Sequence, residues 1–189
     1  DLELAAEEEL KDWIRKSNYL DIRELSAKLQ IKALLLVYQQ HLKEKELDDS
    51  IAEAFMKLNG HKYFWISSVR LAEALSRHSE NVYNFVWTFP GPYGSPFHSS
   101  SLPFFLGWNN TPAGKLMSGE GPEVEKVSEF AFQTLDGFMK SGNPLLHFPD
   151  QQWPSYGKGR YTLVIDKEFE VVNDFNSRLR EAWEKVEPR

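Results

Sequence analysis

The 189-residue sequence predicts an α/β fold, because helix-like segments alternate with strand-like segments. Two stretches rich in β-branched and aromatic residues, 81–89 and 160–166, are typical of strands. The segments around them repeat apolar residues every three or four positions, as amphipathic helices do. Two strands are few for a sheet whose two faces must both be covered, so we expect the chain to be part of a larger sheet.

The first third of the chain has a helical pattern. Apolar residues recur at helical spacing in two groups, Leu10, Trp13 and Ile14, then Ile22, Leu25 and Leu29. Two pairs resemble capping boxes at helix starts, Asp21 with Glu24 and Ser50 with Glu53. Asn59-Gly60 is expected to end the second of these helices, and a further helix is expected over 67–77.

The remaining elements follow in order. The strand at 81–89 is apolar and aromatic on both faces, so we expect it to be buried on both sides. A loop is expected from Pro90 through His98 to Pro112. A helix that begins near Pro122 carries one apolar stripe, Val124, Val127, Phe130, Ala131, Leu135 and Phe138, and ends at Gly142-Asn143-Pro144. The strand at 160–166 precedes a final amphipathic helix with Phe175, Leu179, Ala182, Trp183 and Val186.

Composition excludes several classes of function. A net charge of −6 argues against a nucleic-acid partner, because no basic excess can neutralise phosphates. The absence of cysteine rules out disulfides and thiolate catalysis and fits a reducing compartment, so we expect a cytoplasmic protein. No apolar run has the length of a membrane span, and no membrane partner is expected. The chain begins at Asp1 without a methionine, so we expect that it was trimmed or cut from something longer.

The common motifs for metals, cofactors and nucleophiles are missing. The five histidines, His41, His61, His78, His98 and His147, show no metal-binding spacing, and most are expected to be surface or structural residues. We therefore expect no metal ion. We also expect no cofactor: Gly119-Glu120-Gly121 lacks the context of a dinucleotide-binding loop and is expected to be a turn. The acidic run Glu7-Glu8-Glu9 is expected to be a solvated helix face. A Gly-x-Ser-x-Gly nucleophile motif is also missing, and Ser95 and Ser155 are expected to be loop residues.

His98 is the one histidine whose setting favours chemistry. It follows the strand at 81–89 within a proline-stiffened loop, and dense apolar sequence resumes at Leu102. In open α/β sheets, ligands and reactions are placed at the carboxyl ends of the strands. From the residues alone, two interpretations stay open: an ordinary loop histidine, or an accessible general base.

The segments "YNFVWTF" and "GSPFHSSSLPFFLG" resemble the histidine segment of the type-B carboxylesterase and cholinesterase family, which includes the bacterial para-nitrobenzyl esterases. Downstream, "FMKSGNP" and "QWPSYGKGRYTLVID" resemble a helix end and the closing strand of the same family. These matches occur in the family's order over residues 81–166. Residues 1–80 match the family only in helical character and in "YFW" at 63–65.

The resemblance implies that residues 1–189 are the C-terminal part of one α/β-hydrolase domain, helix-rich, with the last strands of the central sheet. Residues 1–80 would be a helical region, and 81–189 would hold the histidine loop, the last strands and the C-terminal helices. His98 would be the general base of a serine esterase, in which the nucleophilic serine, the triad acid and the oxyanion hole belong to an N-terminal polypeptide. The chain would be inactive alone, and its substrate would be a small carboxylic ester. Phe64, Phe97 and Ser99 are the residues expected to contact substrate.

Ser101 departs from the family pattern, because many members have a glutamate three residues after the histidine. That glutamate is not the triad acid, so the change concerns how the loop is anchored. Two alternatives remain. The chain could belong to a member of the fold that kept a binding or adhesion role without catalysis. It could also be an autonomous small α/β domain whose likeness is accidental.

Overall fold

A computed structural model describes residues 22–186 of the chain, with side chains from residue 28 onward. The chain forms two compact units, Asp1–Arg70 with Asn176–Arg189, and Leu71–Phe175. The predictions for Leu10, Trp13 and Ile14, for the acidic run at 7–9 and for the capping box at Asp21 lie outside the described residues. No helix within the described range is both long enough and apolar enough to cross a membrane.

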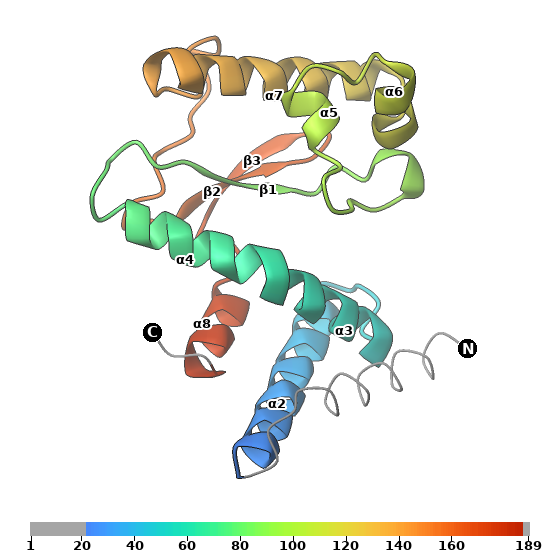
Figure 1. Cartoon of the computed structure of the whole chain (residues 1–189), viewed down its shortest axis with the longest axis vertical. Coiled ribbons are helices and arrows are strands. Elements are labelled where there is room, and N and C mark those ends of the chain that lie inside the picture. Colours follow the sequence, from blue (N-terminus) through green and yellow to red (C-terminus); the bar gives the residue numbers. More distant parts are fainter. Residues whose placement is uncertain (1–21, 187–189) are drawn as a thin grey trace. The chain divides into compact units, whose positions relative to one another are not determined.

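The described part of the first unit is helical (Figure 1). It contains α2 (Ile22–Glu44), α3 (Ile51–Gly60), the π-helix η1 (His61–Trp65), the start of α4 (Ile66–Leu75) and α8 (Ser177–Val186). The predicted start of α3 is confirmed, because the Ser50 hydroxyl accepts a hydrogen bond from the Glu53 N–H at 3.2 Å. The core of the first unit consists of apolar residues of α2, α3, α4 and α8, among them Leu34, Tyr38, Leu58, Ile66, Leu179 and Trp183.

The predicted helix end at Asn59-Gly60 is wrong. Gly60 has helical backbone angles, φ −57° and ψ −42°, and the chain continues through η1 into α4. A glycine inside a helix costs about 1 kcal/mol relative to alanine. Burial of Leu58 before it and Ile66 after it, at 1% and 2% exposure, offsets this cost. Packing on both sides of Gly60 therefore overrides the local stop signal.

The second unit is built on a three-stranded sheet in the order β1-β2-β3. Strand β1 (Asn84–Trp87) runs parallel to β2 (Tyr161–Ile165), in a register that pairs Asn84 with Thr162. Strand β3 (Phe169–Asn173) runs antiparallel to β2 and forms a hairpin with it. The strand predicted at 160–166 is confirmed as β2, whereas β3 was not predicted.

The strand predicted at 81–89 is shorter than expected, and its expected burial on both sides is wrong in this chain. Phe85 of β1 is 40% exposed, whereas Phe89, just beyond the strand, is 4% exposed. The reason is topological: within the described residues β1 pairs with β2 alone and is an edge strand.

The helices of the second unit are η2 (Gly91–Tyr93), α5 (Leu102–Phe105), α6 (Pro112–Ser118) and α7 (Pro122–Ser141). The long helix α7 covers one face of the sheet, where Val127 and Phe130 pack with Leu163 and Ile165 (Figure 1). Its predicted ends are confirmed, because Pro122 is its first residue and Gly142 follows it with φ +73°.

The segments between the strands and α7, and the apolar stripe of α7, agree with the predictions only in part. Helix α5 lies inside the segment predicted as loop, and α6 was not predicted. The turn predicted at 119–121 is confirmed, since Gly119 and Gly121 both have positive φ between α6 and α7. Phe138, expected in the apolar stripe, is 40% exposed and contacts the ring of Tyr83 edge-on at a centroid distance of 6.0 Å.

Candidate active site

His98 lies in a tight turn between η2 and α5, and it is exposed. The backbone N–H of Ser100 donates a hydrogen bond to the carbonyl oxygen of Phe97 at 3.0 Å, so His98 is the second residue of a four-residue turn. The third residue, Ser99, has φ +69°, in the left-handed region. A side chain other than glycine in that region stores about 1–3 kcal/mol of strain, which the surrounding structure must support.

Buried contacts on the C-terminal side of the turn supply that support. Ser100 is 6% exposed, and its hydroxyl accepts a hydrogen bond from the Phe97 N–H at 3.3 Å. Phe104 of α5 is 1% exposed, and its ring lies 4.8 Å from that of Trp87 and 5.5 Å from that of Phe89. The histidine turn is therefore anchored to β1 through a cluster of aromatic side chains.

The turn follows the carboxyl end of β1, where the parallel pair β1–β2 ends. The two strand ends are joined beyond the ladder, because the Thr88 hydroxyl donates to a carboxylate oxygen of Asp166 at 2.8 Å. The same carboxylate accepts the N–H of Lys167 at 2.8 Å, so it has a structural role at this end of the sheet. This is the edge at which open α/β sheets place their reactions, as the sequence predicts for His98.

The structure brings together three of the four residues that we expected at the site. Phe97 and Ser99 flank His98 in the turn, and the Phe97 ring packs edge-on against Tyr93 at 5.6 Å. Phe64 belongs to the first unit, where it lies on η1 with 53% of its surface exposed. The expected contact of Phe64, Phe97 and Ser99 with substrate stays a prediction.

A second histidine makes a carboxylate pair that the sequence did not indicate. His147 Nε2 lies 2.9 Å from Asp136 Oδ2 on α7, and Lys140 Nζ lies 2.9 Å from the same oxygen. These two hydrogen bonds, with Lys140 the stronger influence, hold the pKa of Asp136 below its usual range. No hydroxyl of the described residues bonds to His147, so the pair joins α7 to the segment after it and lacks a nucleophile.

His61 belongs to a buried polar chain in the first unit. The indole N–H of Trp183 donates to the Tyr38 hydroxyl at 2.9 Å, and the oxygen of this hydroxyl lies at hydrogen-bonding distance, 2.8 Å, from His61 Nδ1. Burial, with the nearby charges of Lys57 and His41, lowers the pKa of His61 to about 3, so the ring is neutral at pH 7. Burial also raises the pKa of the Tyr38 hydroxyl, which therefore stays protonated. This row of hydrogen-bonded side chains contains no carboxylate, and we assign it a structural role.

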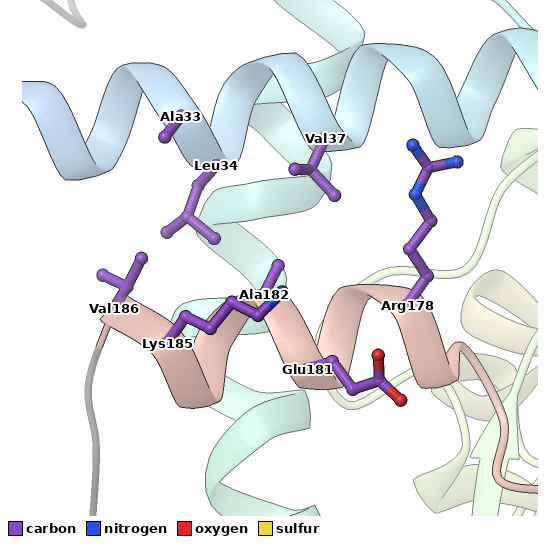
Figure 2. A pocket seen from close by; sticks show the side chains of 8 residues that line it. All are labelled: Ala33, Leu34, Val37, Arg178, Glu181, Ala182, Lys185 and Val186. Atoms are coloured by element: carbon purple, nitrogen blue, oxygen red, sulfur yellow. The ribbon is translucent and has the colours of Figure 1, made fainter.

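An apolar groove of about 230 Å³ lies between α2 and α8. Figure 2 shows Leu34 and Val37 of α2 facing Ala182 and Val186 of α8 across it. Arg178 is one of its charged lining residues, and a single nitrogen, Nη1, donates to both carboxylate oxygens of Glu44, at 2.6 and 2.7 Å. None of its lining residues, all within the described chain, is a histidine, serine or cysteine, so the groove lacks the nucleophile and the histidine base of a serine or cysteine hydrolase.

The described residues also contain no cluster of three or more histidine, aspartate or glutamate side chains that could hold a metal ion. The arrangement described above offers the chemistry of a positioned imidazole beyond the carboxyl end of a strand. Such a group can accept and donate protons in general acid–base catalysis.

Comparison with known proteins points to one family. A model described as the carboxylesterase family matches residues 3–183. A solved PNB esterase structure aligns at 28% identity with a TM-score of 0.59, covering 72% of this chain and 28% of its own. A second PNB esterase structure aligns at 26% identity with a TM-score of 0.59, covering 69% of this chain and 27% of its own.

A carboxylesterase of Geobacillus stearothermophilus shares the fold at 22% identity with a TM-score of 0.66, covering 78% of this chain and 31% of its own. The comparison with curated proteins found no match. The chain thus spans 27–31% of the length of these three solved structures, as a helix-rich piece of the α/β-hydrolase fold with a small mixed sheet.

Proposed function

The chain belongs to the carboxylesterase family, and from this we propose that it is the part of a carboxylic ester hydrolase that supplies the catalytic histidine, His98. The nucleophilic serine, the triad acid and the oxyanion hole would lie on residues outside this chain. Two facts support the division: the sequence has no Gly-x-Ser-x-Gly motif, and it spans less of each solved esterase than a complete enzyme would.

The observation that carries the proposal is the geometry of the 97–100 turn. Its strained Ser99 and its buried neighbours Ser100 and Phe104 hold an exposed imidazole beyond the carboxyl end of β1. A general base must be accessible to substrate and fixed in orientation, and this turn supports both conditions.

In the proposed reaction His98 acts twice. It first accepts the proton of the serine hydroxyl as the oxygen attacks the ester carbonyl, and it then donates that proton to the departing alcohol. A water molecule next attacks the acyl-serine; His98 takes a proton from this water and returns it to the serine oxygen as the acid leaves. The triad acid would orient the imidazole through its other nitrogen.

The test is steady-state hydrolysis of a p-nitrophenyl ester by the complete enzyme that contains this chain. We expect His98→Ala to lower kcat by a factor on the order of 10⁴–10⁶, as removal of a triad histidine does elsewhere. His78→Ala removes an exposed histidine from a turn of the same unit and is the matched control, expected to retain full turnover. Near-normal turnover in the His98→Ala enzyme would reject the assignment.

The alternative, a binding or adhesion member of the fold, predicts a different result. Ser101, where many members have glutamate, is the feature that favours it. In that case the complete protein would hydrolyse no ester, with His98 present or replaced. The serine position of its elbow would also carry another residue.

A further inference from the structure

The groove between α2 and α8 continues on α2 as an exposed apolar face. Ala33 and Val37 line the groove, and Leu29 and Leu36 lie one turn from Ala33 on either side. Leu29 is 60% exposed and Leu36 is 66% exposed. Exposed apolar side chains that are contiguous in this way are typical of an interaction surface. We call these four residues the outer face of α2.

Most of the charged residues that line the groove are already paired. Arg178 donates to Glu44, as described above, and Glu181 Oε1 lies 3.6 Å from Arg180 Nη2. Lys185 differs, because it forms no ion pair with any residue of the described chain. The unbalanced charge of the groove is therefore positive.

That positive charge lies at one end of the groove. In Figure 2, Lys185 lies at the end near Ala33 and Leu34, whereas Arg178 lies at the opposite end. Lys32, next to Ala33 in the sequence, is exposed and also has no ion pair within the part of the chain that the structure describes. An occupant of this surface would thus have apolar residues along the outer face and acids near the two lysines.

Residues 2–14 of this chain have that sequence. The segment lies outside the described residues, and its sequence predicts an amphipathic helix. The acids needed for the lysines are Glu7, Glu8 and Glu9. The apolar residues that share one helical face are Leu2, Ala6, Leu10, Trp13 and Ile14.

The position of the segment in the chain allows it to reach the outer face. Helix α2 begins at Ile22, and a loop of about 2–5 residues is enough to join two antiparallel helices. With a loop over 17–21, a helix over 2–16 would run back along α2 for about 22 Å, at a rise of about 1.5 Å per residue. This register brings Ala6 level with Ala33, where two small side chains let the helices approach closely.

The same register matches the other residues of both surfaces. Leu10 comes level with the exposed Leu29, so apolar residues face each other along the stripe. Glu7 comes level with Lys32, at the end of the groove where Lys185 also lies. A parallel arrangement would need a long connection, which the few residues between the segment and α2 do not provide.

We propose that residues 2–14 bind along the outer face of α2 and cover the α2–α8 groove, as the first helix of an antiparallel hairpin with α2. Burial of apolar surface supplies the affinity, and the acids beside the two lysines favour this direction of the segment. Only residues of the first unit take part, so the proposal does not rest on the role of His98.

The test is disulfide formation between cysteines introduced into the complete enzyme, since this chain has none of its own. Ala6→Cys/Ala33→Cys places them where the helices approach most closely, and a disulfide needs about 4.4–6.8 Å between the Cα atoms. We expect this bond to form when the folded enzyme is treated with diamide. Peptide mapping without reduction identifies it and separates it from any bond to cysteines elsewhere in the enzyme.

Glu8→Cys/Ala33→Cys is the matched control. Glu8 follows Ala6 by two residues, so its side chain points about 200° away around the helix. The two pairs are almost equally separated in sequence, and chance collisions of an unbound segment would link them at similar rates. We expect the Ala6 pair to bond at least about 10-fold faster than the control.

Leu10→Cys/Leu29→Cys, which lies closer to the loop, is a second pair with the same expected result. Bonding of either pair at least about 10-fold faster than the control supports the proposal. If neither pair bonds faster than the control, the proposal is overturned. That result is expected if another part of the enzyme covers the groove or if the groove stays open to solvent.

Discussion

Acidification should lower the free energy of unfolding of the first, helical unit, because His61 is buried there as a neutral ring. In the folded unit, burial and the charges of Lys57 and His41 lower the pKa of this imidazole from 6.5 to about 3. In the unfolded chain the pKa returns to about 6.5, so below that pH the unfolded state binds a proton that the folded state does not. The neutral ring therefore contributes its full stability above pH 6.5, and this contribution is lost as the pH falls towards 3.

The size of the effect follows from the two pKa values. Between pH 8 and pH 4, the difference in proton binding lowers the free energy of unfolding by about 3 kcal/mol. If the pKa of His61 in the folded state were one unit higher, this free-energy change would differ only slightly, because most of it comes from protonation of His61 in the unfolded chain between pH 6.5 and pH 4. His41, whose pKa burial and Lys45 lower, adds a contribution of the same sign.

The assay is hydrogen exchange in the complete enzyme, read from peptides that cover α3, η1 and α8 and corrected for the intrinsic rates at each pH. We expect the free energy of local opening in those peptides to fall by about 3 kcal/mol from pH 8 to pH 4. His61→Gln should remove most of that slope, leaving the part from His41, whereas His78→Gln should leave it intact. An equal slope in the His61→Gln enzyme would refute the reasoning.

Three further predictions concern the elements that hold the site and the helices. Phe104→Ala should cost about 3–5 kcal/mol, because it empties the fully buried contact between α5 and β1; thermal unfolding of the complete enzyme measures the loss. Ser99→Gly should relieve the strain at φ +69° and raise the free energy of unfolding by about 1 kcal/mol; a destabilised variant would show that the serine makes a compensating contact. Ser50→Ala should cost about 1 kcal/mol by removing the cap of α3, and urea unfolding that is unchanged from wild type would contradict it.

The elements that were predictable from the sequence are those whose signals are local. Pro122 and Gly142 mark the two ends of α7, and the run of aromatic and β-branched residues in 160–166 marks β2. Strand β3 was not predicted, because Phe169 and Val171 alone are too few apolar residues to indicate a strand. Its pairing with β2 stabilises it, and that pairing cannot be read from the sequence. At Gly60 the local signal predicted a helix end that does not occur, because tertiary packing stabilises helical structure through a residue type that often ends helices.

The site was predictable only in part, for a related reason. The position of His98 after a strand and before "LPFFLG" can be read from the sequence, but the strain at Ser99 and the buried hydroxyl of Ser100 cannot. The pair of His147 with Asp136 has no sequence signal, because the two residues belong to different segments and to no spaced motif. Residues that the fold brings together over such separations become visible only in three dimensions.

Phosphonylation of the complete enzyme by a fluorophosphonate, followed by intact mass and peptide mapping, tests the central claim most directly. We predict one adduct, on a serine within a Gly-x-Ser-x-Gly segment outside residues 1–189. Its rate of formation should fall at least about 10³-fold in the His98→Ala enzyme, because the hydroxyl loses its base. The His78→Ala enzyme should react at the wild-type rate. An adduct on a residue of this chain, or undiminished labelling of the His98→Ala enzyme, would contradict the account.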